Sequence, residues 1–340
     1  MGEWGRRVTR VGAAVLVGAS LTTAAGAAPA AAEPGTTGCA IERLPVPDET
    51  WRSWANLIDP SGRYIVGNAF VGEARTSVNL LWDRGRVSTI DVPAGPVVAV
   101  NRRGVVVGNT TVEVEGEPFG VIRPWRYRDG AVTRLPVLDP THDTSVTAIN
   151  SAGDAVGIAR DYDAGRQYAV RWPAARPRTV EVLRVPADFV SVVAITDNGT
   201  VVGDAGSIHQ PSGWARRPSG RIDVLTAPDA DGTTTRAARG RWAAAAAYRV
   251  PHPVAVVFDL RTGASTVLPG ITTPEAVNSY GTIVAGDLLG RLDGSVVQLP
   301  APAPGQIVGA HGIANDGTAV GFNNTRDVSG AIHAVRWTGC

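Results

Sequence analysis

The chain has 340 residues, with 32 basic and 31 acidic side chains and a formal net charge of +1 at pH 7. It contains no lysine, so all of these basic residues are arginines. A nearly balanced charge gives no electrostatic attraction to nucleic acid or to an anionic membrane surface. The composition therefore argues against both of these partners.

The N-terminus has the pattern of a secretory signal peptide. A basic start precedes a short uncharged apolar run, residues 11–21, and three alanines ending at Ala32 form a small-residue cleavage site. We expect residues 1–32 to be the signal peptide and residues 33–340 to be a single domain outside the cell. An arginine pair near the start would also suit twin-arginine export, but its flanks favour the general secretory route. No later apolar run is long enough to span a bilayer.

A short pattern recurs along the rest of the chain. Its clearest copy runs from Ala148 to Gly157, and other copies begin at Val100, Ile195 and Ile313. In each copy a short apolar strand leads into a polar turn with Asn or Asp, the turn closes at Gly, and a β-branched strand follows. Asn and Asp bond to their own backbone in turns, and glycine adopts positive φ there, so each copy predicts a β-hairpin.

Two further strands complete each repeat. The third ends in an aromatic residue in most copies, as at Trp82, Trp172 and Trp337, and the fourth commonly ends at proline, as at Pro136 and Pro300. The turn glycines recur about every 40 residues, a spacing typical of β-propeller blades. These glycines are Gly62, Gly104, Gly153, Gly199, Gly240, Gly281 and Gly317.

We therefore predict an all-β fold, a seven-bladed β-propeller of four-stranded blades. The fifth unit keeps Gly240 but loses the turn Asn, and the sixth unit is short around Asp287. If these two units do not form separate blades, the ring has six. A solenoid is disfavoured because it would need capping units at both ends.

The two ends of the chain are expected to close the ring together. The last unit stops after the strand that ends at Trp337, so it lacks a fourth strand. Residues 41–47 resemble the fourth strand of the second unit, residues 132–137, and would supply the missing one. Closure of this kind removes exposed strand edges.

The two cysteines fit this closure. Cys39 lies just before the borrowed strand and Cys340 just after the last one, so a disulfide between them would replace the missing turn. An even cysteine count in an exported chain favours a disulfide. The alternative is a lipid-modified Cys39.

The best copies read Ile-Asn-x-x-Gly-x-x-Val-Gly, followed by His or Tyr and then Ala-Val-x-Trp. They are residues 149–157 with 168–172, and residues 313–321 with 333–337. This pattern resembles the bacterial extracellular repeats called HAF repeats, and the resemblance covers most of residues 54–340. It implies a β-propeller-like repeat protein of an exported bacterial type and assigns no catalytic or binding residue.

Motifs for catalysis are absent from the sequence. There is no G-x-S-x-G and no H-E-x-x-H, and the aspartates near Asn198 and Gly232 lack the glutamate of a calcium loop. The innermost strands are small and apolar, and their only ionisable residues are Glu275 and His311. We interpret these two as isolated residues rather than a pair, and we predict no metal and no cofactor.

Polar residues after the second strand of each unit form the predicted site. In a propeller they would lie on one face around a concavity, where amides, acids and aromatic groups suit a sugar or peptide. The alternative is that these residues bind no ligand and are polar only because strand ends and loops generally are. The predicted ligand-binding residues are Asn68, Asn109, Asp161, Tyr162, Asp204, His209, Asp287, Asn323 and Arg326.

We predict a secreted, monomeric β-propeller that binds or scaffolds an extracellular glycan or protein through this face, and we favour this over an enzyme. The alternatives are a polysaccharide hydrolase or lyase on the same ring and a surface protein without a ligand. Carboxylates clustered within about 5–10 Å of one another would favour the enzyme. A channel lined by Ala, Val and Ile would favour the binding protein.

Overall fold

The computed structural model describes residues 38–115, 117–185, 187, 190–207, 210–248, 252–325 and 330–340. The chain divides into two units, Met1–Thr36 and Thr37–Cys340, and the described residues belong to the second. The predicted signal peptide lies outside them. The described residues form strands and turns without a helix, so they include no helix that could cross a membrane.

The strands follow one another in sets that match the sequence repeats. The first repeat holds β2 (Thr50–Ile58), β3 (Tyr64–Val71), β4 (Thr76–Asp83) and β5 (Arg86–Ile90). The second holds β6 (Val97–Val100), β7 (Val106–Val114), β8 (Glu117–Arg128) and β9 (Ala131–Arg134). The third holds β10 (Thr144–Ile149), β11 (Ala155–Asp161), β12 (Arg166–Trp172) and β13 (Glu181–Leu183). The fourth holds β14 (Val190–Ile195), β15 (Val201–Ser207), β16 (Gln210–Arg216) and β17 (Ile222–Leu225).

The remaining repeats include the two that depart most from the pattern. The fifth holds β18 (Gly232–Arg239), β19 (Trp242–Tyr248), β20 (Val254–Asp259) and β21 (Ser265–Leu268). The sixth holds β22 (Ala276–Val277), β23 (Ile283–Ala285), β24 (Leu288–Gly290) and β25 (Val296–Gln298). The seventh holds β26 (Ile307–Ile313), β27 (Ala319–Asn324) and β28 (Ile332–Thr338). Both the fifth and the sixth repeat form four-stranded antiparallel sheets, although β22 to β25 are short.

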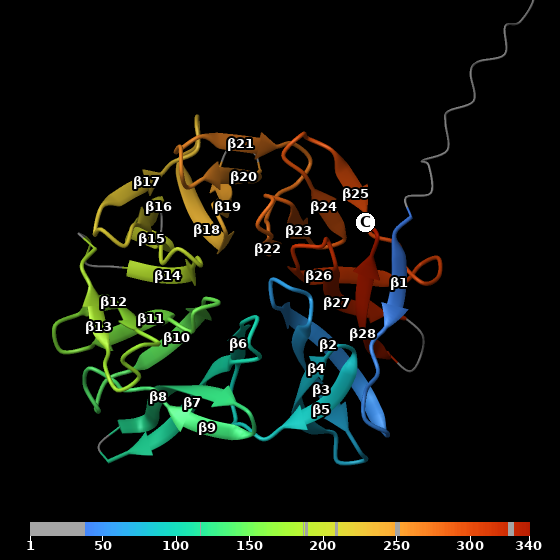
Figure 1. Cartoon of the computed structure of the whole chain (residues 1–340), viewed down its shortest axis with the longest axis horizontal. Coiled ribbons are helices and arrows are strands. Elements are labelled where there is room, and N and C mark those ends of the chain that lie inside the picture. Colours follow the sequence, from blue (N-terminus) through green and yellow to red (C-terminus); the bar gives the residue numbers. More distant parts are fainter. Residues whose placement is uncertain are drawn as a thin grey trace, which may run out of the picture. The chain divides into compact units, whose positions relative to one another are not determined.

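The sheets are small and lie around a common centre, as in a β-propeller (Figure 1). Repeats two to six each form a separate four-stranded sheet, and the first and seventh repeats join in one eight-stranded sheet. That junction is a single parallel pair, Arg52 with Ile332. The chain therefore forms six or seven small units, depending on whether the joined sheet is counted as one or two.

The N-terminal strand completes the seventh repeat, as predicted. β1 (Ala40–Arg43) pairs antiparallel with β28, with Ile41 opposite Trp337. The backbone contact continues one residue further, where Leu44 N donates to Ala334 O at 2.9 Å. The strand is shorter than the predicted range 41–47 because the chain bends away at Pro45, which cannot donate to a sheet.

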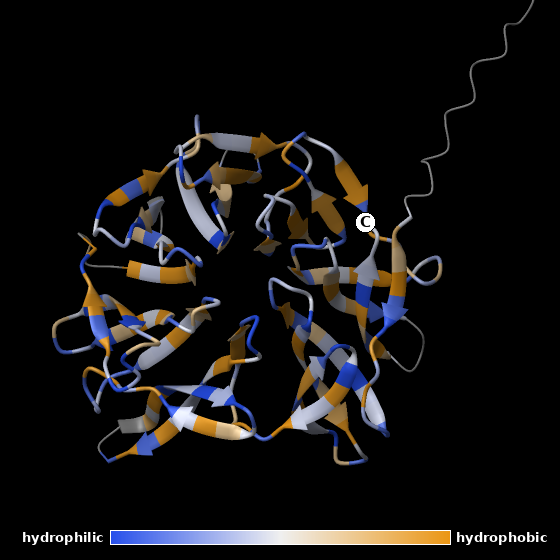
Figure 2. Cartoon of the chain, in the orientation of Figure 1, coloured by the Kyte–Doolittle hydropathy of each residue, from blue (hydrophilic) through white to orange (hydrophobic). Residues whose placement is uncertain are grey.

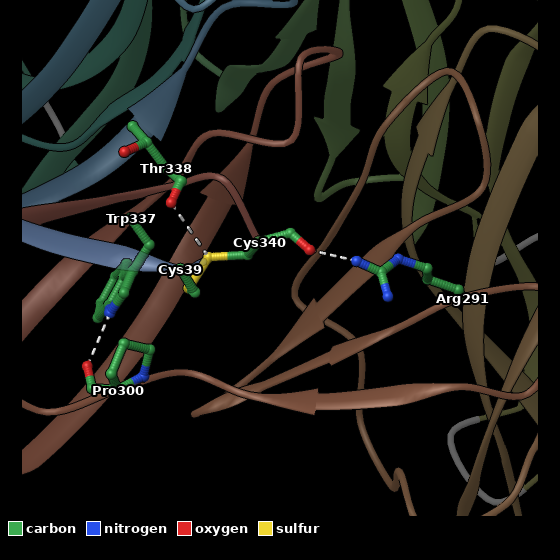
Figure 3. Close-up of a disulfide and its surroundings, with 6 residues drawn as sticks. All are labelled: Cys39, Arg291, Pro300, Trp337, Thr338 and Cys340. Carbon is green, nitrogen blue, oxygen red and sulfur yellow. Dashed lines mark hydrogen bonds between the residues drawn. A yellow bond between two sulfur atoms is a disulfide. The ribbon is translucent and has the colours of Figure 1, made fainter. Parts of the chain in front are cut away.

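The predicted disulfide is also present. Cys39 and Cys340 are bonded, with their Cα atoms 4.3 Å apart and 301 residues between them in sequence (Figure 3). The bond uses the sulfur that a lipid anchor on Cys39 would need. Arg291 of the sixth repeat donates to Cys340 O, so the closure also contacts the neighbouring sheet. In the chain-entropy model a loop of this length stabilises the fold by about 5 kcal/mol.

The core lies between neighbouring sheets. Apolar residues occur in the strands of every sheet, whereas hydrophilic residues concentrate in the connections (Figure 2). Three buried tryptophans also make a hydrogen bond across a junction. Their indole Nε1 atoms donate to the proline that follows the outermost strand of the preceding repeat: Trp82 to Pro45 O (2.6 Å), Trp172 to Pro136 O (2.7 Å) and Trp337 to Pro300 O (3.0 Å).

The turn asparagines have two roles. Asn101 Oδ1 accepts from Arg103 N and Val105 N, which closes its own hairpin as the sequence predicts. Its Nδ2 donates to Asn150 O in the next repeat at 2.9 Å. Asn150 repeats the arrangement, with Nδ2 donating to Thr196 O at 3.3 Å. The turns therefore also connect neighbouring sheets, a role that hairpin chemistry alone does not predict.

Candidate functional site

The innermost strands share one irregularity. In β2, β6, β10, β14, β18 and β26, one residue at the same place is extra relative to the neighbouring strand, which is a β-bulge. A bulge bends the strand and redirects a side chain. The extra residues are Asn56, Val98, Thr147, Val193, Arg236 and His311. Glu275 holds the corresponding place just before β22, where its N donates to Val284 O at 2.8 Å.

The bulge explains the last glycine of the repeat pattern. A Cβ added to Gly157 would lie 1.9 Å from Ser145 O on the bulged strand, a distance that real Cβ atoms do not reach. The same holds for three other repeats, at Gly67, Gly203 and Gly321, where the distances are 1.8, 2.0 and 1.8 Å. This glycine is needed because two backbones approach closely, not because the chain turns.

A cavity of about 340 Å³ lies among the innermost strands, and all seven of these side chains line it. The seven strand positions surround the centre of the ring in Figure 1. Four polar members come from consecutive repeats, the fifth, sixth, seventh and first. We call this set the polar arc: Arg236, Glu275, His311 and Asn56. The opposite side of the cavity has Val98, Thr147 and Val193.

His311 and Glu275 form a pair, which corrects the interpretation of them as isolated residues. His311 Nδ1 lies 2.6 Å from Glu275 Oε2, and both side chains are about one third exposed. The imidazole stacks on Phe322, with ring centroids 5.5 Å apart and an interplanar angle of 26°. A carboxylate on one ring nitrogen orients the imidazole and leaves the other nitrogen available for a ligand or a proton.

Two arginines of the fifth repeat also line the cavity. Arg239 stands where other repeats have the turn Asn, and its guanidinium donates to Ile313 O at 2.7 Å and Ile58 O at 3.3 Å. Burial lowers the pKa of Arg239. Arg236, by contrast, is exposed, and no described residue makes a hydrogen bond or an ion pair with it.

The cavity has only two carboxylates in its described lining, and both have partners. Glu275 is bonded to His311, as above. Asp197 lies 3.5 Å from Arg102 and accepts from Ser151 N at 2.9 Å. These carboxylates come from the fourth and the sixth repeat, and each is engaged by another side chain or backbone group, which differs from the two free carboxyl groups that a typical glycoside hydrolase uses. Arg236 is the charged group of the lining that makes no hydrogen bond or ion pair with a described residue, although its charge acts on Asp204.

Three of the predicted site residues lie at or near junctions between sheets; Asn109 and Asn323 are buried and Asp204 is half-buried. Asn109 is 7% exposed and exchanges two hydrogen bonds of 2.9 Å with the backbone of Val146 in the next repeat. Asp204 accepts from Thr235 N at 2.7 Å, again in the next repeat, and burial raises the pKa of Asp204. Asn323 is fully buried, and neither polar atom of its side chain has a partner in the described part of the chain.

Asn68 is placed differently from these three. Its Oδ1 accepts from Asn56 Nδ2 at 2.8 Å within the same repeat, and it lines a second cavity at the junction with the next repeat. Asn68 thereby contacts a member of the polar arc. It is connected to the central cavity through a side chain that lines it.

The remaining predicted residues are dispersed. Asp161 lines a cavity in the third repeat, beside which Tyr162 is 57% exposed and donates to Asp143 Oδ2 at 2.5 Å. Asp287 is exposed in the turn before β24 and accepts from Gln298 Nε2 at 2.8 Å. His209 and Arg326 lie outside the described residues. Nowhere in the described part do three His, Cys, Asp or Glu side chains gather in a way that could hold a metal ion.

Sequence reasoning missed two members of the polar arc, Asn56 and Arg236. Both lie three residues before the turn residue of their repeat, Asp59 and Arg239, as His311 lies three before Ala314. Aligning all repeats on the turn would have placed them in one ring of equivalent positions. The fifth repeat is harder to align because the turn between its first two strands is shorter than in the other repeats.

Comparison with known proteins identifies the fold. No family model and no curated protein matches the chain. Among solved structures, a streptogramin B lyase is 12% identical with a TM-score of 0.55, covering 88% of this chain and 97% of that one. Virginiamycin B lyase from Staphylococcus aureus is 12% identical with a TM-score of 0.53, covering 88% and 98%. An oligogalacturonate lyase from Vibrio parahaemolyticus is 11% identical with a TM-score of 0.59, covering 89% and 94%.

Identities this low establish architecture and not activity. The chain is an all-β, β-propeller-like protein with a disulfide between its two ends. A disulfide of this kind indicates an oxidising environment.

Proposed function

We propose that the protein is an exported binding protein whose polar arc holds a polar ligand with an anionic group, of the acidic-glycan class. The observation that carries this proposal is Arg236, an exposed guanidinium that makes no hydrogen bond or ion pair with a described residue, in a cavity whose two carboxylates are both paired. Polar groups that converge on one concave cavity are typical of a ligand site. A guanidinium fits a carboxylate or sulfate in a two-pronged bond.

The other members of the arc would orient the rest of the ligand. His311 Nδ1 is engaged by Glu275, which leaves Nε2 for a ligand hydroxyl. Asn56 donates its Nδ2 to Asn68, which leaves Oδ1 as an acceptor. The apolar wall of Val98 and Val193 would face the ring carbons of a sugar.

We also propose seven blades, with β1 as the outermost strand of the last. Trp82 bonds to Pro45 after β1 in the same way as Trp172 bonds to Pro136 after β9, so β1 is equivalent to an outermost strand. Seven residues occupy the bulge position around the cavity, one from each repeat. Export by the N-terminal signal and membership of the HAF-repeat type remain proposals that rest on the sequence.

A glycan array tests the proposed ligand class. Acidic glycans are expected to bind the protein at least about tenfold more tightly than neutral glycans of the same backbone, because a charge-assisted hydrogen bond contributes about 1.5–3 kcal/mol. Arg236→Gln is expected to remove that preference. Arg178→Gln, an exposed arginine in the connection before β13, is the matched control and is expected to leave binding unchanged. Equal binding of acidic and neutral glycans, or full binding by Arg236→Gln, would reject the proposal.

A second candidate is an enzyme that moves a proton with His311. The 2.6 Å contact with Glu275 favours it, because a carboxylate that orients imidazole is the usual support of a general acid or base. Mass spectrometry of bound glycans after incubation separates the outcomes. Hydrolysis adds one water to the cleaved chain and elimination adds none, whereas a binding protein returns the glycan intact.

A further inference from the structure

A second cavity, of about 590 Å³, lies between the first and second repeats. Its polar lining consists of Asn56, Asn68, Ser77 and Asn79, and none of its lining residues is ionisable. Val66, Val92 and Val97 supply apolar wall. Asn56 and Leu57 line both this cavity and the central one, so the two adjoin here, and Asn56 is the polar side chain that they share. We call this second cavity the amide cleft.

The cleft is open because one side chain departs from the pattern of the other repeats. The residue after the second-strand glycine bonds to the next repeat in two cases: Asn109 to Val146 and Asp204 to Thr235. Asn68 is the equivalent residue of the first repeat, but it bonds to Asn56 in its own repeat instead. No hydrogen bond or ion pair among the described residues joins β2–β5 to β6–β9, and the space next to Asn68 is left as the cavity.

The cleft offers hydrogen-bonding groups that the protein does not use. Asn68 Nδ2, Asn56 Oδ1, the Asn79 amide and the Ser77 hydroxyl have no partner among the described residues. Uncharged amides both donate and accept, which matches sugar hydroxyls, and the valines suit the C–H faces of a pyranose ring. A charged group would be left unpaired there at a cost, because nothing in the lining could neutralise it.

We infer that the amide cleft is a subsite for the neutral part of an oligosaccharide whose acidic residue occupies the polar arc. The inference rests on the proposed function and extends it from a single anionic group to a chain that is charged at one end and neutral at the other. Asn56 lies where the two parts of the ligand would join.

The test uses a glycan array printed with acidic oligosaccharides of increasing length, in which a neutral sugar follows the acidic one. The affinity of the protein is expected to rise about tenfold when the neutral sugar is added to the acidic one, since two or more hydrogen bonds form. Ser77→Ala with Asn79→Ala is expected to abolish that gain and to keep the binding of the acidic monosaccharide, because neither side chain contacts a member of the polar arc. Gln167→Ala, which removes an amide from β12 in the third repeat, is the control.

A second readout separates ligand contact from a structural effect. In protein labelled with 15N at asparagine, the side-chain resonances of Asn68 and Asn79 are expected to shift with the longer acidic oligosaccharide and not with the monosaccharide. Binding that is independent of length, or a length gain that survives in the double variant, overturns the subsite and leaves the polar arc intact. Binding of acidic peptides in place of acidic glycans overturns it too. Absence of any acidic ligand rejects the proposed function and the subsite together.

Discussion

The junction between the second and third repeats differs from the junction between the first and second. The former has several cross-junction hydrogen bonds, among them Asn101 to Asn150 O, the two between Asn109 and Val146, and Trp172 to Pro136 O. The latter has none of them in the described part of the chain. There Asp59 accepts only within its own turn, Asn68 bonds to Asn56, and Tyr127 stands where the third repeat has Trp172.

The junction that lacks these bonds is held by apolar packing. Val66 and Ile90 of the first repeat contact Val100, Val106 and Trp125 of the second in one buried cluster. Burial of such side chains contributes stability without fixing a particular polar partner. The same repeat can therefore form a junction with several polar bonds or one with a cleft. The two junctions differ at the turn residue, at the residue after the second-strand glycine and at the aromatic residue of the third strand.

The amides at the two junctions are expected to differ most in their effect on stability. Asn109→Ala removes two buried hydrogen bonds and leaves the N–H and C=O of Val146, itself fully buried, without partners. The free energy of unfolding is expected to fall by about 3 kcal/mol, because unpaired buried groups cost about 1–3 kcal/mol each. Asn68→Ala is expected to cost less than about 0.5 kcal/mol, since its amide faces a cavity.

Urea denaturation of both variants measures this difference as a shift in the midpoint. Equal costs at Asn68 and Asn109 would mean that the two junctions are closed to the same degree, and the distinction between them would be lost.

Two buried tryptophans also differ between the two junctions. Trp172 and Trp125 are both fully buried, but only Trp172 Nε1 has a partner; Trp125 Nε1 has none in the described part. Both Phe variants lose part of the ring, which costs a similar amount in packing. Trp172→Phe also loses a hydrogen bond, and Trp125→Phe also removes an unpaired donor. The free energy of unfolding of Trp172→Phe is expected to lie below that of Trp125→Phe by about 1 kcal/mol or more in the same denaturation series. A larger loss of stability in Trp125→Phe would contradict the inference that only Trp172 Nε1 contributes a hydrogen bond.

The structural features that recur in every repeat are predicted well from the sequence. The Asn and Gly of each turn, the aromatic residue of the third strand and the two terminal cysteines predict the hairpins, the sheets and the closure by β1. Each of these follows from local turn chemistry or from counting strands. The second role of the turn Asn was not predicted, because its Nδ2 partner lies in another repeat.

The candidate site could be predicted only in part, because it consists of what does not repeat. Glu275 and His311 were visible as the ionisable residues of apolar strands, but their 2.6 Å contact depends on a bulge that sequence patterns do not reveal. Asn109 and Asn68 occupy equivalent places in sequence, and only their side-chain directions distinguish a junction bond from a cleft. Direction of this kind is decided by tertiary packing.

Asp204→Asn tests whether the junction between the fourth and fifth repeats can be bonded by an amide, as Asn109 bonds the junction between the second and third. Burial raises the pKa of Asp204 in the folded protein, so the folded state holds its proton more tightly than the unfolded chain does. Stability is therefore unaffected by this group below the ordinary pKa of aspartate, falls as pH rises through the interval up to the folded pKa, and stays lowered above it.

The new amide would carry no charge, and it could donate to the next repeat as Asn109 does. The variant is expected to match the wild type near pH 3 and to exceed it by up to about 1 kcal/mol at pH 7. Unfolding curves collected across this range measure the change. A variant that loses stability at pH 7 would show instead that the carboxylate, through its bonds from Thr235 N and Ser191 Oγ, is the form that this junction requires.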